Sequence, residues 1–456
     1  MKEFLKKYIG PKAFYAKTAR IAIPLSLQNL LSSCMGIVDT LMVSWIGMVT
    51  AVGTAAQIDT LCSMISYGSI GGTSMFSSQF YGAKDYKNLK KTFGLSLMLA
   101  GGNAIFWFLV ATFAGREILF FYMPDQEIIK FSMQYLNIAK FGLVIGSINF
   151  AFSYMYRSIQ NAKVSLSVSI LTISMNAVLN ACLIFGFGPF PQMGVEGAAL
   201  GTVIAQSTGL AVYITHAILT KQPFFGSFRE MFIMDKDFTL PILKKVVPLI
   251  FNETLFGLGS TLFIKAFGQL GKSSMDAYYV GNQIYNTFLF IVYGYGSAIQ
   301  VLLGVKLGSG KIEEAKQDAN YHLGLSVLLS IILVIGMIVF AFPMTSIFKL
   351  DDPFVQLLAV QIVWVFAVKV SMRLFNFIIF SILRAGGESK VIQVLDSGIL
   401  WVIGLPSAFI CVNLLGMSSI VWVLLITQIE QLVRLFFGMI CVRQENWARD
   451  ITVLVD

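Results

Sequence analysis

The chain has little charge and few of the side chains on which enzyme and metal chemistry depend. Only 12% of its 456 residues are charged, and it contains two histidines and five cysteines. His216 and His322 are far apart in sequence, and neither has a neighbouring acid or cysteine, so they do not predict a metal site. Because the cysteines lack C-x-x-C spacing, we expect reduced packing residues and no disulfide framework.

Motifs for phosphate and transferase chemistry are incomplete or absent. Residues 308–311, GSGK, resemble the end of a phosphate-binding loop, but Val305 replaces the first glycine and Ile312 replaces the Ser or Thr that should follow. No predicted cytoplasmic loop carries paired acids such as D-x-x-D, and no stretch is long enough for a soluble catalytic domain. We therefore expect neither enzymatic activity nor a cofactor.

Long apolar runs dominate the sequence instead. Hydrophobic residues make up 56% of the chain, and the mean hydropathy is +0.76. Twelve runs are each long enough to cross a hydrocarbon core of roughly 30 Å, and their lack of period-two alternation predicts helices. We predict an all-α integral membrane protein with spans at about 19–44, 52–80, 93–114, 131–156, 163–187, 197–219, 242–267, 276–305, 321–343, 354–382, 390–412 and 418–442.

Basic residues set the predicted orientation in the membrane. They concentrate in both tails and in every second connection, for example at Lys84, Lys87, Lys90 and Lys91 after the second span. By the positive-inside rule we expect a plasma-membrane protein with both termini cytoplasmic. The net charge of +9 is then a topological bias, and since no basic face is interleaved with exposed aromatic residues, we expect no nucleic-acid partner.

The second half of the chain weakly repeats the first at a spacing of about 224 residues. PLSLQN (24–29) aligns with PLIFNE (248–253), AAQID (55–59) with GNQIY (281–285), and YRSIQNAKVS with LRAGGESKVI. Six spans per half make the halves parallel repeats, and two such lobes facing a central cleft suit alternating access, so we predict a transporter. The expected organisation is an amphipathic cytoplasmic segment 1–18, an N-lobe 19–220, a cytoplasmic linker 221–241, a C-lobe 242–442 and a cytoplasmic tail 443–456.

Several motifs in order along the chain resemble one transporter family. They include GGTSMFSSQFYGAKD in the second span, NAVLNACLIFGFG in the fifth, GVEGAALGTVIAQ entering the sixth, GSAIQVLLGVKLGSGK in the eighth and ILRAGGESK before the eleventh. Over residues 17–447 the chain resembles the multidrug and toxic compound extrusion (MATE) family. The resemblance implies an antiporter that exchanges H+ or Na+ for organic, often cationic, compounds. Its expected partners are those small substrates and the lipid bilayer, and we expect a monomer.

Glu253 is the one acid in the apolar stretch VVPLIFNETLF, residues 246–256. At about 1.5 Å of rise per residue, it lies about 16 Å into a helix that starts near residue 242, close to the middle of the membrane. Burial disfavours a bare carboxylate there, so Glu253 is expected to prefer H+, Na+ or a cationic substrate. In NorM-type relatives, which this segment resembles, a glutamate at the corresponding place is a coupling site.

A second candidate site combines residues of three predicted helices in the N-lobe. Asn176 and Asn180 are four residues apart and share a helix face, and their predicted depth matches that of Asp39 and Thr202. The DinF-like branch of the family, which this pattern resembles, builds its cation network from an Asp, an Asn and Asp pair and a Thr. Asn180 replaces the second acid of that pattern, and simple interhelical hydrogen bonding is the alternative role.

Other polar residues in the spans are secondary candidates. Glu430 and Arg434 are expected to form an i,i+4 ion pair, and Arg373 is expected to lie near a helix end and reach toward water. Two deep lysines could neutralise Glu253 or Glu430, or could contact an anionic group of a substrate. The secondary candidates are Glu430, Lys369, Lys140, Gln283 and Gln57.

Two other functions remain open from the sequence. A flippase for lipid-linked precursors, from the same superfamily, would use Lys140 and Lys369 to bind phosphate, although acids at similar depth compete with them. A membrane-embedded transferase would need the paired acids that are missing. The choice between H+ and Na+, the substrates and the stoichiometry are not determined by the sequence.

Overall fold

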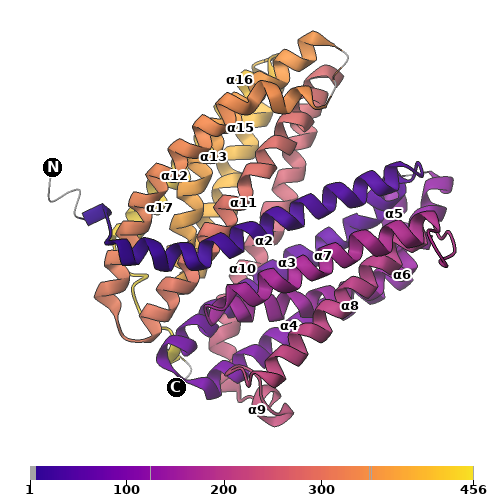
Figure 1. Cartoon of the computed structure of the whole chain (residues 1–456). Helices are drawn as coiled ribbons and strands as arrows, with labels where there is room; N and C mark the ends of the chain where they lie inside the picture. The colour runs from indigo at the N-terminus through magenta and orange to yellow at the C-terminus, as the bar shows by residue number, and fades with distance from the viewer. Residues whose placement is uncertain (1–6, 124, 349, 351, 455–456) are drawn as a thin grey trace. The chain divides into compact units, whose positions relative to one another are not determined.

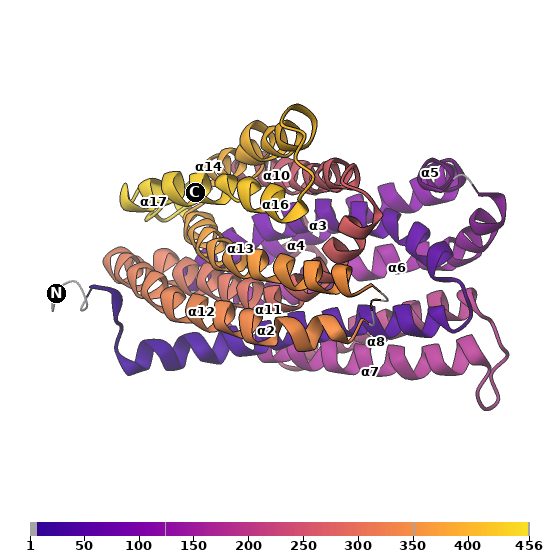
Figure 2. The same cartoon turned by 90° about the horizontal axis from the view of Figure 1, so that it is seen from above.

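The computed structural model describes residues 7–123, 125–348, 350 and 352–454, and these residues contain no β-strand. Figures 1 and 2 show long helices connected by short turns. Residues 1–6 of the predicted amphipathic segment and residues 455–456 of the predicted tail lie outside the described residues. The described part confirms the all-α fold class.

The described residues of the first half form six long helices and two short ones. The long helices are α2 (Lys12–Ser44), α3 (Val49–Ala83), α4 (Tyr86–Phe113), α6 (Gln126–Ser158), α7 (Ala162–Phe185) and α8 (Val195–Leu219). The short helix α5 (Gly115–Tyr122) connects α4 to α6, and α9 (Phe228–Phe232) follows α8.

The second half again forms six long helical segments. Four are continuous: α10 (Lys236–Gly268), α11 (Lys272–Gly308), α12 (Ile312–Ser346) and α13 (Pro353–Ala385). The fifth runs through α14 (Ser389–Gln393), the π-helical segments η1 (Val394–Gly398) and η2 (Leu400–Gly404), α15 (Leu405–Phe409) and the π-helical η3 (Ile410–Leu414). The sixth comprises α16 (Ile420–Thr427) and α17 (Ile429–Arg443), and a short 3-10 turn η4 (Thr452–Leu454) follows.

Eleven helical segments of the described residues are long and apolar enough to cross a membrane. The one predicted span outside this set is 52–80, which corresponds to α3; this helix has 35 residues but buries many Gly, Ser and Thr side chains. Small residues of this kind let neighbouring helices approach closely. The chain is therefore a multi-pass membrane protein.

Acidic residues that precede helices fix several helix starts. The Asp85 carboxylate accepts from the Asn88 backbone N–H at 3.0 Å before α4, and Asp125 accepts from Glu127 N–H at 2.9 Å before α6. Asp352 likewise accepts from Phe354 N–H at 2.8 Å before α13, whose first residue is a proline. Each cap satisfies a backbone donor that lacks a partner within its helix.

The described helices gather into two compact bodies, one of residues 27–250 and one of residues 251–453, and residues 7–26 pack in the second. In the first body α3, α4 and α6 pack against one another, and α7 and α8 pack on α6 and on each other (Figure 1). In the second body α11, α12 and α13 pack together and α17 packs on α13. The proposed sites below each lie within one body.

The segment between α8 and α10 is held on α4 by an ion pair. Lys90 Nζ of α4 lies 2.7 Å from Glu230 Oε1 of α9, and Ser227 and Glu230 form a capping box at the start of α9. The Lys90 ammonium and the Ser227 hydrogen bonds lower the pKa of Glu230 from 4.5 to about 2. Glu230 therefore stays ionised at every pH above its ordinary value.

We expect the ion pair of Lys90 with Glu230 to be independent of pH between 6 and 8. A depressed carboxylate pKa stabilises the folded form above the unfolded pKa, here 4.5, and the contribution is lost only as the pH falls toward about 2. Chymotrypsin should cleave the segment at equal rates at pH 6 and 8, once the rates are scaled to those on an unstructured peptide. Glu230→Gln should raise both rates modestly, since exposed ion pairs contribute little. Faster cleavage of the unsubstituted protein at pH 6 would contradict the assignment.

Candidate functional site

Four polar side chains of the first body form a connected cluster. The Asn180 side-chain amide donates to Asp39 Oδ1 at 2.9 Å and to Asn176 Oδ1 at 3.2 Å. The Asn176 amide donates to the Thr202 hydroxyl at 3.0 Å, and that hydroxyl donates to the Ala198 carbonyl at 3.0 Å. The predicted meeting of these residues from α2, α7 and α8 is confirmed, while their role in coupling stays a prediction.

An apolar layer lies one helical turn from the cluster. Val43 follows Asp39 by four residues on α2, Ile184 follows Asn180 by four on α7, and Ala198 precedes Thr202 by four on the antiparallel α8. Val43, Ile184 and Ala198 are buried in one apolar group. This layer lies between the cluster and the C-terminal ends of α2 and α7. It lowers the local dielectric, which strengthens electrostatic interactions at Asp39.

The cluster offers oxygen ligands around a single carboxylate. Asn176 and Asn180 are 0% and 1% exposed, whereas Asp39 is half-buried. The Asn180 Oδ1 atom is buried and accepts no hydrogen bond from the described residues. Carboxylate, amide and hydroxyl oxygens suit a hard cation such as Na+, and the carboxylate alone can take a proton.

Gly201 of α8 makes room for Asn180. A Cβ at position 201 would lie 2.3 Å from Asn180 Oδ1. We expect Gly201→Ala to displace the Asn180 side chain from Asp39 and to lower ion-driven efflux in proteoliposomes strongly. Gly142→Ala is the control, because a Cβ there would lie at an acceptable 3.4 Å from the nearest atom. Equal efflux by the Gly201 and Gly142 variants would show that the Asn180 position is unimportant.

Glu253 has a partner that the sequence did not indicate. Arg384 Nη2, in the last turn of α13, lies 3.3 Å from Glu253 Oε1. Arg157, which aligns with Arg384 in the repeat, contacts a neutral residue instead. Arg157 Nη2 donates to Gln28 Oε1 at 2.9 Å, and Gln28 aligns with Asn252, the residue before Glu253. Of the alternatives for Lys140 and Lys369, an ion pair with Glu253 is not found among the described residues, and the alternatives of Glu430 or an anionic substrate group stay predictions. From the sequence, Arg157 and Arg384 contributed only to the predicted membrane orientation. Their matching positions in the repeat were the feature that could have indicated a shared structural role.

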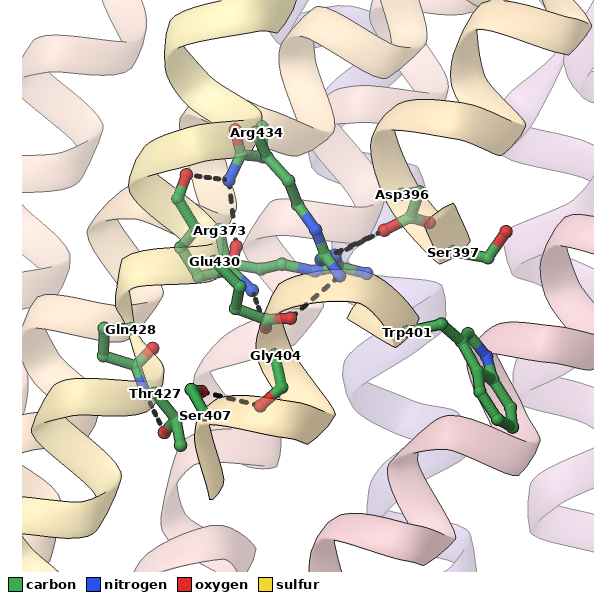
Figure 3. Close-up of polar contacts among 12 residues, drawn as sticks. Arg373, Asp396, Ser397, Trp401, Gly404, Ser407, Thr427, Gln428, Glu430 and Arg434 are labelled. Carbon is green, nitrogen blue, oxygen red and sulfur yellow. Dashed lines mark hydrogen bonds and ion pairs between the residues drawn. The ribbon is translucent and has the colours of Figure 1, made fainter. Parts of the chain in front are cut away.

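A buried ionic network lies in the second body (Figure 3). Asp396 Oδ1 lies 3.1 Å from Arg434 Nη1 and 3.4 Å from Arg373 Nη1, and Arg434 Nη2 lies 3.2 Å from Glu430 Oε2. The Asn252 side-chain amide donates to Asp396 Oδ2 at 3.3 Å. The predicted ion pair of Glu430 with Arg434 is confirmed. The expectation for Arg373 is wrong. Arg373 lies within α13 and not at its end, and its side chain is buried and faces Asp396.

The π-helical turns before α16 build this network. Asp396 lies within η1, and Gly404, at the end of η2, leaves space for Glu430, because a Cβ at position 404 would lie 2.3 Å from Glu430 Oε2. Wider turns of this kind occur mostly at functional sites, and they change which side chains face a neighbouring helix. Hydrophobic periodicity with a period of 3.6 does not reveal such turns, so the sequence pattern does not single out Asp396 as part of a site.

The remaining candidates do not join these clusters through hydrogen bonds or ion pairs. Lys140 lies over the Phe108 ring at 5.6 Å, and Lys369 lies over the Tyr285 ring at 4.8 Å. Gln57 is exposed and donates to the Gly53 carbonyl of its own helix at 3.3 Å. Gln283 is exposed on α11. Their roles in transport stay predictions.

Comparison with known proteins agrees with this architecture. The family model MatE matches residues 24–182 and 248–410, one segment in each half of the chain. YoeA of Bacillus subtilis, a probable multidrug resistance protein, is 24% identical over 85% of this chain and 85% of its own length. The multidrug export protein MepA of Staphylococcus saprophyticus is 22% identical over 94% of each chain.

A solved structure shows the same fold. The crystal structure of a variant of the Vibrio cholerae MATE transporter VcmN superposes with a TM-score of 0.87 at 17% identity, covering 96% of this chain and 98% of the other. Because the family model covers more than half of the sequence, the comparison decides the family as well as the fold. The chain belongs to the MatE family of multidrug and toxic compound extrusion proteins, which are membrane transporters and not enzymes.

Proposed function

We propose that the protein is a multidrug efflux antiporter that exchanges H+ or Na+ for organic compounds by alternating access. The names of its relatives support efflux, since YoeA and MepA are named as multidrug resistance and export proteins. The distribution of Lys and Arg supports a plasma-membrane location with both termini cytoplasmic. We propose that it works as a monomer without a cofactor.

The Asp39 cluster is the observation that carries the proposal. Asp39 is the only acid in the cluster, and its Oδ1 atom accepts from Asn180 among apolar helices. An ionised carboxylate in such surroundings is unfavourable unless a proton or a cation compensates its charge. A coupling ion and a cationic substrate relieve the same cost, so binding of one disfavours the other. Competition of this kind is the basis of exchange.

Glu253 is the second candidate for coupling. Arg384 already compensates its charge, whereas Arg157, which aligns with Arg384 in the repeat, contacts the uncharged Gln28. A carboxylate with a guanidinium partner gains less from binding Na+ than one without. We therefore place the primary coupling site at Asp39 and assign Glu253 and Arg384 to a supporting pair.

Transport of ethidium by purified protein in proteoliposomes tests the proposal. A pH gradient and a Na+ gradient are imposed separately, and the gradient that drives ethidium movement identifies the coupling ion. We expect movement under one gradient and none when both are absent. Transport that ignores both gradients would contradict antiport, and no transport of ethidium or of a panel of organic cations and anions would contradict multidrug efflux.

A further inference from the structure

A cavity of about 320 Å³ lies within the second body, between α10, α11, α13 and the last two helical segments. Its volume is at the lower end of the roughly 300 to 1,000 Å³ of ligand pockets. Aromatic side chains form much of its wall, including Phe256, Phe267, Tyr278 and Tyr285. Flat walls of this kind suit a ligand with an aromatic body.

The ionic groups on the cavity wall have an excess of positive charge. Lys369, Arg373 and Glu430 line the cavity. Both oxygens of Glu430 are already engaged, Oε1 by the Gln431 amide at 2.9 Å and Oε2 by Arg434 at 3.2 Å. An organic cation in this cavity would therefore find no carboxylate oxygen free of a donor.

Cations also lie over the faces of three aromatic rings. Lys369 Nζ lies 4.8 Å from the Tyr285 ring centre and 4.9 Å from the Phe366 ring centre, and the Arg373 guanidinium lies 4.9 Å from the Phe256 ring centre. A ligand cation seeking the same rings would meet charges of its own sign. Aromatic walls thus do not favour cations here.

Lys369 differs from the two arginines beside it. Arg373 and Arg434 both pair with Asp396, whereas Lys369 pairs with no carboxylate among the residues that the structure describes. It is half-buried on the cavity wall, with three donors on its ammonium group. Glu430 acts on Lys369 electrostatically, but the two form no ion pair among the described residues, because Glu430 is paired with Arg434. A partly buried cation without a paired carboxylate is unfavourable, and an anionic ligand would supply that partner.

We propose that this cavity binds amphipathic organic acids, with the acid group on Lys369 and the aromatic body against Tyr278, Tyr285 and Phe267. The assignment extends the substrates beyond organic cations and deepens the proposed efflux function, on which its role in transport rests. Asn282, which also lines the cavity, can donate to the same acid group. Binding to the cavity can be measured without any gradient.

Two probes of one shape and opposite charge test the proposal. Naphthalene-2-sulfonate and 2-naphthylmethylammonium are dialysed to equilibrium against the full chain in phosphatidylcholine nanodiscs, and binding to protein-free discs is subtracted. We expect the sulfonate to bind at least about tenfold more tightly than the ammonium compound, because hydrogen bonds to charged groups are the stronger ones. Equal affinities, or tighter binding of the ammonium compound, would overturn the proposal.

Variants locate the binding. Lys369→Gln should weaken sulfonate binding about tenfold to a hundredfold, and Lys369→Arg should preserve most of it. Lys140→Gln is the matched control, since Lys140 also lies over an aromatic ring but belongs to the first body and does not line the cavity. If Lys369→Gln does not fold, Asn282→Asp serves instead, because an added carboxylate should weaken sulfonate binding and strengthen ammonium binding. Unchanged affinities in the folded variants would overturn the assignment.

The transport assay separates this proposal from the efflux function. Lys369→Gln should still move ethidium under the coupling gradient while losing transport of naphthalene-2-sulfonate. If the unsubstituted protein moves ethidium but binds the sulfonate no more tightly than the ammonium compound, only the anion site is overturned. Sulfonate binding without gradient-driven movement of any compound would overturn the efflux function and leave the site in place.

Discussion

Replacing Asp39 with asparagine should reduce gradient-driven ethidium transport to the level of protein-free liposomes. Asparagine keeps the size of the side chain and can still accept a hydrogen bond from Asn180, which now lies 2.9 Å from Asp39 Oδ1. It cannot bind a proton near neutral pH and carries no charge for Na+ or a cation. The variant should therefore fold and insert normally but lose coupling.

The matched control for this variant is Asp59→Asn. Asp59 is an acid of the next helix, α3, in the same body, and it is exposed. Transport is followed in proteoliposomes that contain equal amounts of monodisperse protein. Coupled transport by the Asp39 variant, or an equal loss in the Asp59 variant, would show that coupling does not depend on the Asp39 cluster.

Replacing Asp396 with alanine should give the largest loss of stability. Asp396 is 6% exposed and lies within 3.4 Å of Arg373 and 3.1 Å of Arg434, which are themselves 7% and 0% exposed. Removing one partner from a buried ionic group leaves charge without compensation and costs about 3 to 5 kcal/mol. At roughly 2 to 4 °C per kcal/mol for a body of this size, the melting temperature in detergent should fall by about 10 °C or more.

Glu388→Ala is the control for that measurement. Glu388 also pairs with an arginine of the same body, Arg449 at 2.5 Å, but the Arg449 side chain is 46% exposed. An exposed pair contributes about 0 to 1 kcal/mol, so this variant should melt within a few degrees of the unsubstituted protein. Similar melting temperatures for the two variants would mean that the Asp396 network is not a source of stability.

The sites recoverable from sequence were those set by local spacing. Asn176 and Asn180, like Glu430 and Arg434, are four residues apart, so a helix places each pair on one face regardless of its neighbours. Asp39 and Thr202 were grouped with the two asparagines because the rise per residue gave all four a similar depth in the membrane. The hydrogen bonds of Asn180 to Asp39 and of Asn176 to Thr202 confirm that the four side chains meet. Arg373 was misplaced for the opposite reason. Its distance from the helix end suggested contact with water, but the neighbouring helices bury it.

By itself the sequence determined that this chain is a helical membrane protein of two similar halves, because apolar length and periodicity act within each segment. It also singled out one main candidate carboxylate for coupling in each half, Asp39 and Glu253. Only the tertiary structure decided that Arg384 compensates Glu253, that Asp396 holds two arginines, and that Lys369 has no carboxylate partner among the described residues. These contacts join residues from separate helices, and some depend on π-helical turns, so they follow from helix packing and not from spacing along the chain.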